Sequence, residues 1–199
     1  MLTYKRNSIW IDSVTLWSDN IYKSPYNAQP YNYRGLAYFQ RGEYAKAIVD
    51  YNLALKLNSN YAECYNNRAN TYINLGEYER AIADCNQVLK INPYLAKPYY
   101  NRANIYMIKK EYDRAISEYN QAIKFDNNYV AAYNERGVGY ALQGEADKAI
   151  SDYTQALSID PDYAPAYYNR GIVYRNRGEY DKARQDIQRA QALGQKVEF

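Results

Sequence analysis

The sequence predicts an all-α protein built from five helix–turn–helix repeats. A segment of the form Tyr-x-x-Arg-Gly/Ala returns every 34 residues, small residues recur at fixed places in each period, and apolar residues between them follow helical spacing. The repeats run without insertion over 28–61, 62–95, 96–129, 130–163 and 164–197. An array of this kind is expected over most of the 199 residues.

The first helix of each repeat is predicted from its small eighth residue and from the residue that ends it. Glycine or alanine at the eighth position allows another helix to approach closely. Proline falls in the first turn of three of these helices, where it is tolerated. The fifteenth residue is glycine in four repeats and Lys110 in the third, and it is expected to form the turn that ends the helix. The eighth residues are Gly35, Ala69, Ala103, Gly137 and Gly171.

The second helix is predicted from an alanine that occupies the twentieth position of every repeat and from apolar residues at helical spacing around it. A turn former or breaker follows each second helix and separates it from the next repeat. The alanines are Ala47, Ala81, Ala115, Ala149 and Ala183, and the turn residues are Ser59, Pro93, Asn127 and Pro161.

These columns resemble the tetratricopeptide repeat (TPR) family, whose signature has aromatics at positions 4 and 11, small residues at 8 and 20, and proline at 32. The resemblance covers residues 28–197 and departs only at Ser59, Lys110, Asn127 and Ala146. It implies a right-handed superhelical solenoid of antiparallel helix pairs that binds other proteins and has no catalytic activity. The aromatic columns are Tyr31, Tyr65, Tyr99, Tyr133 and Tyr167, and Tyr38, Tyr72, Tyr106, Tyr140 and Tyr174.

Residues 1–27 are expected to form a degenerate half-repeat that caps the array. Trp10 and Trp17 fall in columns of a second helix and are expected to stack on the first repeat. The stretch 5–17 also resembles the junction between transmembrane helices and the TPR tail of glycosyltransferase-like membrane proteins, which implies a longer chain tethered through its N-terminus. In the last repeat, Arg184 and Gln191 replace apolar residues, as expected of a C-terminal cap, and residues 198–199 form a short tail.

Composition argues against several functions. The 25 basic and 22 acidic side chains are too balanced to indicate a nucleic-acid partner, and there is no histidine to serve as a general base or metal ligand. Cys64 and Cys85 have no metal-binding spacing, so no cofactor, metal or enzymatic activity is expected. No apolar run approaches the roughly 18 residues of a membrane span. The chain is expected to be soluble as written, extracytoplasmic and membrane-tethered if it is a fragment and otherwise cytoplasmic.

Two columns of opposite charge predict an ion-pair ladder. Arginine occupies position 7 of every repeat, and an acidic residue occupies position 23, on the second helix. We expect structural pairing rather than phosphate or carboxylate binding. The columns are Arg34, Arg68, Arg102, Arg136 and Arg170, and Asp50, Asp84, Glu118, Asp152 and Asp186.

Tyrosine is the most over-represented residue, at 27 of 199. Twenty of these tyrosines fall at positions 4, 11, 17, 24 or 34, which pack within or between repeats in TPR proteins. We therefore expect most tyrosines to belong to the core rather than to a stacking site for bases or sugars.

The resemblance places a ligand on the first helices, at positions 2, 5, 6, 9, 12 and 13. Those positions are rich in asparagine, whose amide can donate to and accept from the backbone of an extended peptide. A similar asparagine ladder occurs in the TPR domain of O-linked N-acetylglucosamine transferases. The predicted peptide-binding residues are Asn32, Asn66, Asn67, Asn70, Asn74, Tyr100, Asn101, Asn104, Asn134, Tyr168 and Asn169.

The leading functional prediction is a scaffold that binds an extended segment of a protein partner. Chaperone-binding TPRs have a lysine at position 5 that holds the C-terminal carboxylate of the chaperone. This chain lacks that lysine, so a chaperone C-terminus is not an expected partner. The same face carries few charges (Glu63, Lys97, Glu135 and Arg175), which argues against nucleic acid. Two alternatives stay open: a self-assembling scaffold that forms homo-oligomers, and the substrate-recruiting tail of a membrane-bound transferase.

Overall fold

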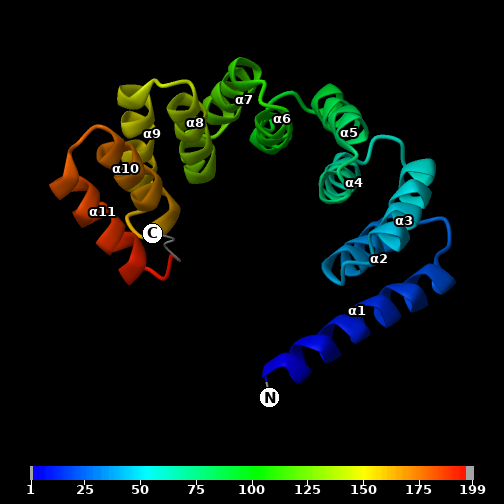
Figure 1. The fold of residues 1–199 in the computed structure, drawn as a ribbon. Coiled ribbons are helices and arrows are strands. Elements are labelled where there is room, and N and C mark those ends of the chain that lie inside the picture. Colours follow the sequence, from blue (N-terminus) through cyan, green and yellow to red (C-terminus); the bar gives the residue numbers. More distant parts are fainter. Residues whose placement is uncertain (1, 196–199) are drawn as a thin grey trace. The chain divides into compact units, whose positions relative to one another are not determined.

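The computed structural model describes the backbone of residues 2–195 and the side chains of residues 13–195, and all regular elements in the described part are helices (Figure 1). Each predicted repeat contributes one helix pair, which confirms the all-α class. The helices are α1 (Leu2–Lys23), α2 (Ala28–Gln40), α3 (Tyr44–Leu57), α4 (Ala62–Asn74), α5 (Tyr78–Ile91), α6 (Ala96–Ile108), α7 (Tyr112–Phe125), α8 (Val130–Leu142), α9 (Ala146–Ile159), α10 (Ala164–Asn176) and α11 (Tyr180–Ala192).

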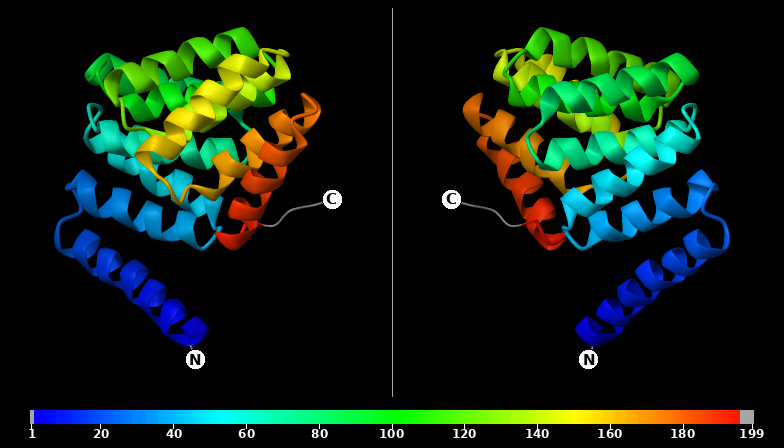
Figure 2. Two further views of the ribbon diagram at one scale, coloured as in Figure 1. Left: turned by 90° about the vertical axis from the view of Figure 1, so that its left-hand side faces the viewer. Right: turned by 90° about the vertical axis from the view of Figure 1, so that its right-hand side faces the viewer.

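The chain divides into two compact halves, Met1–Pro93 and Tyr94–Phe199, and each is described by itself. In the N-terminal half, α2 packs on α3 and α4 on α5. In the C-terminal half, the pairs are α6 with α7, α8 with α9 and α10 with α11. The two helices of each pair run antiparallel and are joined by a short turn (Figure 2).

The turn inside each pair is a Schellman motif. The residue at position 15 has a left-handed backbone, with φ of 76° at Gly42 and 80° at Gly144. The next residue donates its N–H to the carbonyl five residues earlier, as Glu43 does to Tyr38 at 2.9 Å. These bonds satisfy carbonyls that the end of the helix would leave unpaired. Lys110 takes the same conformation, with φ of 60°, which explains how the third repeat forms its turn without glycine.

Lys110→Gly is expected to stabilise the C-terminal half by about 1 kcal/mol, because glycine adopts a positive φ without the steric cost that a β-carbon adds. Urea unfolding would measure the gain. The reverse change, Gly144→Lys, is expected to cost a similar amount, since nothing lies within 4 Å of an added β-carbon there and only the backbone term changes. An unchanged stability in both variants would contradict this account.

The turn between repeats depends on position 31 more than on proline. The side chain there accepts a hydrogen bond from the N–H two residues on, at 3.1 Å for Asn58 and Asp126 and 3.0 Å for Asp160. This Asx turn fixes the backbone locally. The first and third repeats therefore end normally although Ser59 and Asn127 stand where the family has proline.

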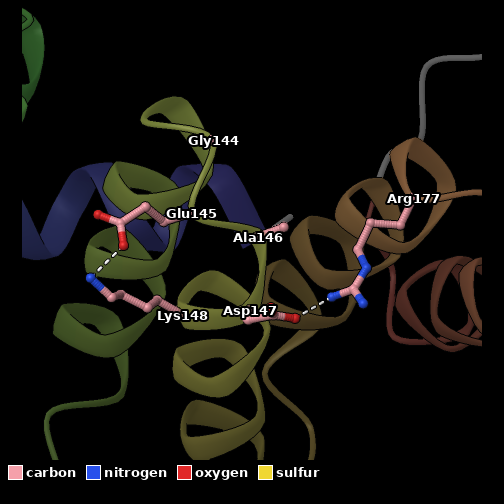
Figure 3. A pocket seen from close by; sticks show the side chains of 6 residues that line it. All are labelled: Gly144, Glu145, Ala146, Asp147, Lys148 and Arg177. Carbon is pink, nitrogen blue, oxygen red and sulfur yellow. Dashed lines mark hydrogen bonds and ion pairs between the residues drawn. The ribbon is translucent and has the colours of Figure 1, made fainter.

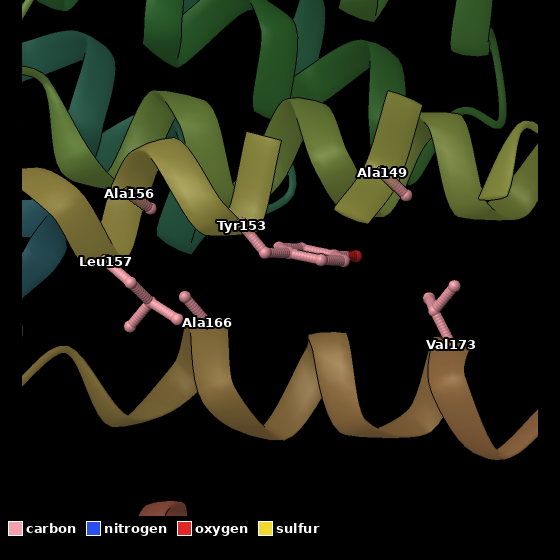
Figure 4. Close-up of a cluster of buried hydrophobic side chains, with 6 residues drawn as sticks. All are labelled: Ala149, Tyr153, Ala156, Leu157, Ala166 and Val173. Carbon is pink, nitrogen blue, oxygen red and sulfur yellow. The ribbon is translucent and has the colours of Figure 1, made fainter. Parts of the chain in front are cut away.

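In four of the five repeats the interior of the pair is built from the alanine column and a large residue at position 24, and in the second repeat Cys85 takes that position. Figure 4 shows this core in the fourth repeat, where the Tyr153 ring of α9 lies beside Ala149 and Ala156 and faces Ala166 and Val173 of α10. The alanines are 0% exposed and Tyr153 is 1% exposed. Small residues on one helix thus make room for a whole aromatic ring.

The tyrosines divide into two groups, which refines the prediction that they form the core. Those at position 24 are fully buried, with Tyr51 and Tyr119 at 0% exposure. Most tyrosines at positions 4 and 11 are only half-buried, and their ring faces carry cations instead. In the fourth repeat, Arg136 lies 5.4 Å from the Tyr133 centroid and 6.0 Å from that of Tyr140. Cation–π contacts of this kind recur along both columns.

The predicted ion-pair ladder is confirmed in all five repeats. Each arginine of position 7 binds the carboxylate of position 23 at 2.6–2.7 Å, and four of the five carboxylates belong to residues that are only 2–7% exposed. In four repeats, the remaining arginine nitrogen binds the second helix of the preceding repeat or the corresponding residue of α1. Each arginine thereby joins three helices, which a leucine could not do. These contacts are Arg34–Ser18, Arg68–Asn52, Arg136–Asn120 and Arg170–Thr154.

Helix α1 lies alongside α2 (Figure 2). The Trp17 ring stacks on Tyr33 with centroids 4.7 Å apart, and the Ser18 hydroxyl accepts from Arg34 at 3.2 Å. The Trp10 side chain lies outside the described residues. The assignment of 1–27 as a half-repeat stays a prediction. None of the described helices combines the length and apolarity that a membrane span requires.

Candidate functional site

The first helices of neighbouring repeats touch one another, whereas the second helices do not. In the N-terminal half α2 contacts α4, and in the C-terminal half α8 contacts both α6 and α10. Among the described residues of each half, second helices make no such contact with one another. The first helices therefore form a continuous face in each half, and this face carries the predicted asparagines.

Asparagines at positions 5 and 6 join consecutive first helices. The Asn67 amide donates to the Asn32 carbonyl oxygen at 3.1 Å, and Asn169 donates to Asn134 at 3.0 Å. Asn32 is 0% exposed and Asn134 is 2% exposed. A buried amide without a partner costs about 1–3 kcal/mol, so these bonds are part of what holds the repeats together.

The predicted peptide-binding set accordingly separates by exposure. Asn32, Asn101 and Asn134 are buried and stand between helices. The other members are half-buried or, for Asn74, exposed, so a partner could reach them. The sequence does contain a signal for this pairing: asparagine recurs 35 residues apart, at position 5 of one repeat and position 6 of the next. The reachable members are Asn66, Asn67, Asn70, Asn74, Tyr100, Asn104, Tyr168 and Asn169.

Three tyrosines cluster beside α6: Tyr100 lies on α6, Tyr119 on α7 and Tyr129 directly before α8. The Tyr119 hydroxyl donates to the Asn104 side chain at 2.6 Å, and the Tyr100 ring lies 5.8 Å from Tyr119 and 4.9 Å from Tyr129, centroid to centroid. Burial raises the pKa of Tyr129 to about 12. All three hydroxyls are therefore neutral at physiological pH and can both donate and accept.

Glu135 on α8 is the charged residue of this cluster. Its carboxylate accepts a hydrogen bond from Asn134 at 3.0 Å, and its side chain is half-buried. Burial raises the pKa of the Glu135 carboxyl, and the Asn134 bond offsets part of the rise. After burial itself, the nearby Glu135 charge is a further cause of the raised pKa of Tyr119 and Tyr163. The sequence showed Glu135 on this face but gave no reason to select it.

A surface pocket of about 440 Å³ lies elsewhere, at the turn between α8 and α9 (Figure 3). Its charged side chains are already paired: Glu145 with Lys148, and Asp147 with Arg177. Since each pair neutralises itself, the pocket presents no free charge with which to select a ligand.

The cysteines do not form a reactive site. Cys64 and Cys85 are both 0% exposed, and burial raises the pKa of the Cys64 thiol to about 12. A thiol with so high a pKa is protonated and a poor nucleophile. No group of three or more metal-ligating side chains occurs in the part of the chain that the structure describes.

Comparisons with known proteins agree with this architecture. Similar solved structures include a crystal structure of MamA, with 28% identity and a TM-score of 0.71, which covers 80% of this chain and 93% of that one. Another is YrrB, described as a TPR protein with an unusual peptide-binding site, with 22% identity, a TM-score of 0.68 and coverages of 89% and 92%. A third is pilF of Pseudomonas aeruginosa, with 19% identity, a TM-score of 0.78 and coverages of 85% and 78%. The last two, with identities under 25%, indicate the fold alone. No curated protein matches the sequence.

Family models cover most of the repeat array. A TPR repeat model matches residues 35–76, 103–144 and 139–178, and a tetratricopeptide repeat model matches residues 62–95 and 164–195. Together with the 34-residue period, the helix pairs and the structural neighbours, these matches place the chain in the tetratricopeptide repeat family, to which it belongs.

Proposed function

We propose that this chain is a non-catalytic interaction module that holds an extended segment of a partner protein on the first-helix face. The observation that carries the proposal is the row of reachable amides on α4. Asn70 is half-buried and Asn74 is exposed, and they lie four residues apart, on one side of the helix. Amides spaced along a helix can bond the backbone of a peptide whatever its sequence.

The family and the fold support this role. TPR proteins commonly bind other proteins, and a peptide-binding site is described for YrrB, which has the same fold. The face is also poor in charge, which favours backbone recognition over an electrostatic partner.

A peptide selected from a random 16-residue display library would test the proposal. With the peptide fluorescein-labelled, Asn70→Ala/Asn74→Ala is expected to weaken binding about tenfold in an anisotropy titration, because each lost hydrogen bond contributes about 0.5–1.5 kcal/mol. These two residues are preferred to Asn67, whose loss would strand the buried Asn32.

The matched control removes two amides from second helices, Gln121→Ala/Gln155→Ala, and is expected to change the affinity less than twofold. Equal effects of the two double variants, or none in either, would contradict binding on the first-helix face. Circular dichroism confirms that both variants are folded before the titration is read.

A further inference from the structure

At one step of the asparagine ladder the chemistry changes. Positions 5 and 6 of consecutive repeats pair as Asn32 with Asn67 and as Asn134 with Asn169, but the corresponding residues of the third and fourth repeats are Tyr100 and Glu135. A carboxylate only accepts hydrogen bonds and carries a charge, whereas the amide it replaces is neutral. The exchange therefore puts one negative charge on a face that is otherwise amide and aromatic.

Among the residues whose side chains are described, no lysine or arginine pairs with this charge. Two buried carboxylates of the C-terminal half, Asp152 and Asp186, each bind an arginine, at 2.6 and 2.7 Å. Within the described residues the only hydrogen bond to Glu135 comes from the Asn134 amide, and no ion pair reaches it. A half-buried charge without a counter-ion lowers the stability of the free chain, and a role in binding would account for its presence.

The surroundings of Glu135 suit a cation. The register of the ladder places Tyr100 beside Glu135, because Asn32 and Asn134, at the same position 5, each contact the position-6 residue of the next repeat. Asn32 also donates to the hydroxyl of Tyr61 at position 34, so the equivalent Tyr163 lies beside Asn134, whose amide bonds Glu135. In keeping with this placement, the charge of Glu135 is, after burial, a lesser cause of the raised pKa of Tyr100 and Tyr163. Tyr100 lies on α6 and Tyr163 in the turn before α10, so they approach the carboxylate from different elements. Aromatic faces and hydroxyl oxygens attract a cation, and a nearby carboxylate adds a charge-assisted partner.

We propose that Glu135, with Tyr100 and Tyr163, forms a specificity site that takes a lysine or arginine side chain of the bound partner segment. The inference rests on the proposed function, to which it adds a sequence preference. Reachable amides of the same half, such as Asn169, hold the backbone of the segment, and Glu135 selects its register by one basic residue. The charge that costs stability in the free chain becomes part of an ion pair in the complex.

The test uses four pools of 12-residue peptides, randomised except for a central lysine, arginine, norleucine or glutamate, titrated against the full chain. The lysine and arginine pools are expected to bind about tenfold more tightly than the norleucine and glutamate pools. Norleucine matches the lysine stem without the charge, so the difference isolates the cation. Glu135→Gln, which keeps the hydrogen bond with Asn134, is expected to bring the pools within twofold of one another.

Glu63→Gln is the matched control, because Glu63 also accepts an asparagine amide, from Asn32 at 3.4 Å, but is exposed. It is expected to keep the preference for basic pools. Glu135→Gln is also expected to raise the Tm, since it removes a half-buried charge, so lost preference would not reflect misfolding.

The outcomes separate the two proposals. Four pools that bind the wild type equally, yet lose affinity in Asn70→Ala/Asn74→Ala, would overturn the cation site and leave the proposed function standing. A preference for basic pools that survives in Glu135→Gln would overturn the assignment to Glu135. Binding that neither Asn70→Ala/Asn74→Ala nor Glu135→Gln changes would overturn both.

Discussion

Arg136→Leu is expected to lower the stability of the C-terminal half by about 3 kcal/mol, the low end of the range for breaking a buried ion pair. Arg136 binds both carboxylate oxygens of Asp152, at 2.6 and 2.8 Å, and the Asn120 side chain at 2.7 Å. Leucine keeps the packing on the neighbouring rings but leaves Asp152, whose side chain is 8% exposed, without its partner. Because Arg136 joins α7, α8 and α9, the loss of stability affects all three helices.

Lys148→Leu is the matched control. Lys148 also pairs with a carboxylate, that of Glu145, and also lies over the Tyr140 ring, at 5.3 Å. Its side chain is 59% exposed, however, against 17% for Arg136. An exposed pair of this kind contributes about 0–1 kcal/mol. The two variants thus separate burial and bidentate geometry from charge.

Native-state hydrogen exchange is the measurement of choice, because repeat proteins need not unfold in a single step. The amides of α8 and α9 are expected to lose protection in Arg136→Leu, while those of α2 and α3 keep it. Similar losses of protection in Arg136→Leu and Lys148→Leu would show that the buried ion pair contributes no more stability than an exposed one.

The helices and the ladder could be predicted because each depends on residues that repeat. A 34-residue period repeats the same local physics five times, so one exception does not obscure the pattern. Lys110 and Ser59 depart from the family, yet their turns form because a Schellman bond and an Asx bond supply what glycine and proline usually do. The paired columns of opposite charge were visible for the same reason.

The candidate site was less predictable because exposure depends on neighbours from other repeats. The polarity of asparagine at position 5 predicts a surface residue, but Asn32 and Asn134 are buried beneath the first helix of the following repeat. Glu135 was hidden for the opposite reason: it occurs once, and a single deviation in a column carries no periodic signal. Only the register of the ladder, which places Tyr100 and Tyr163 around it, distinguishes it from an ordinary surface carboxylate.

The core prediction with the largest effect concerns Gly137 and Tyr153. A β-carbon added to Gly137 would lie 2.7 Å from Cε1 of the buried Tyr153 ring. Such overpacking costs about 1–3 kcal/mol, so Gly137→Ala is expected to destabilise the C-terminal half despite the better helix propensity of alanine. Gly139→Ala is the control on the same helix, since its closest contact, to Ile116, is 3.2 Å.

The second repeat suggests how the clash is relieved, because it carries Ala69 at the glycine position and Cys85 at the tyrosine position. Tyr153→Cys alone is expected to cost about 3 kcal/mol, since it leaves a cavity where a ring was. The double variant Gly137→Ala/Tyr153→Cys is expected to lose at least 1 kcal/mol less than the sum of the single losses, because the added methyl group then fills part of that cavity.

The third repeat shows that an alanine at position 8 and a tyrosine at position 24 can occur together. There Ala103 occurs together with Tyr119, whose hydroxyl is bonded to Asn104 at 2.6 Å. Val138 holds the corresponding place in the fourth repeat and cannot accept that bond, so Tyr153 lacks this anchor for a shifted ring. If the two losses are additive in urea unfolding, the Tyr153 ring moves aside even without such a hydrogen bond, and the coupling is contradicted. Non-additive losses would show that a glycine at position 8 is required by the ring that packs on it.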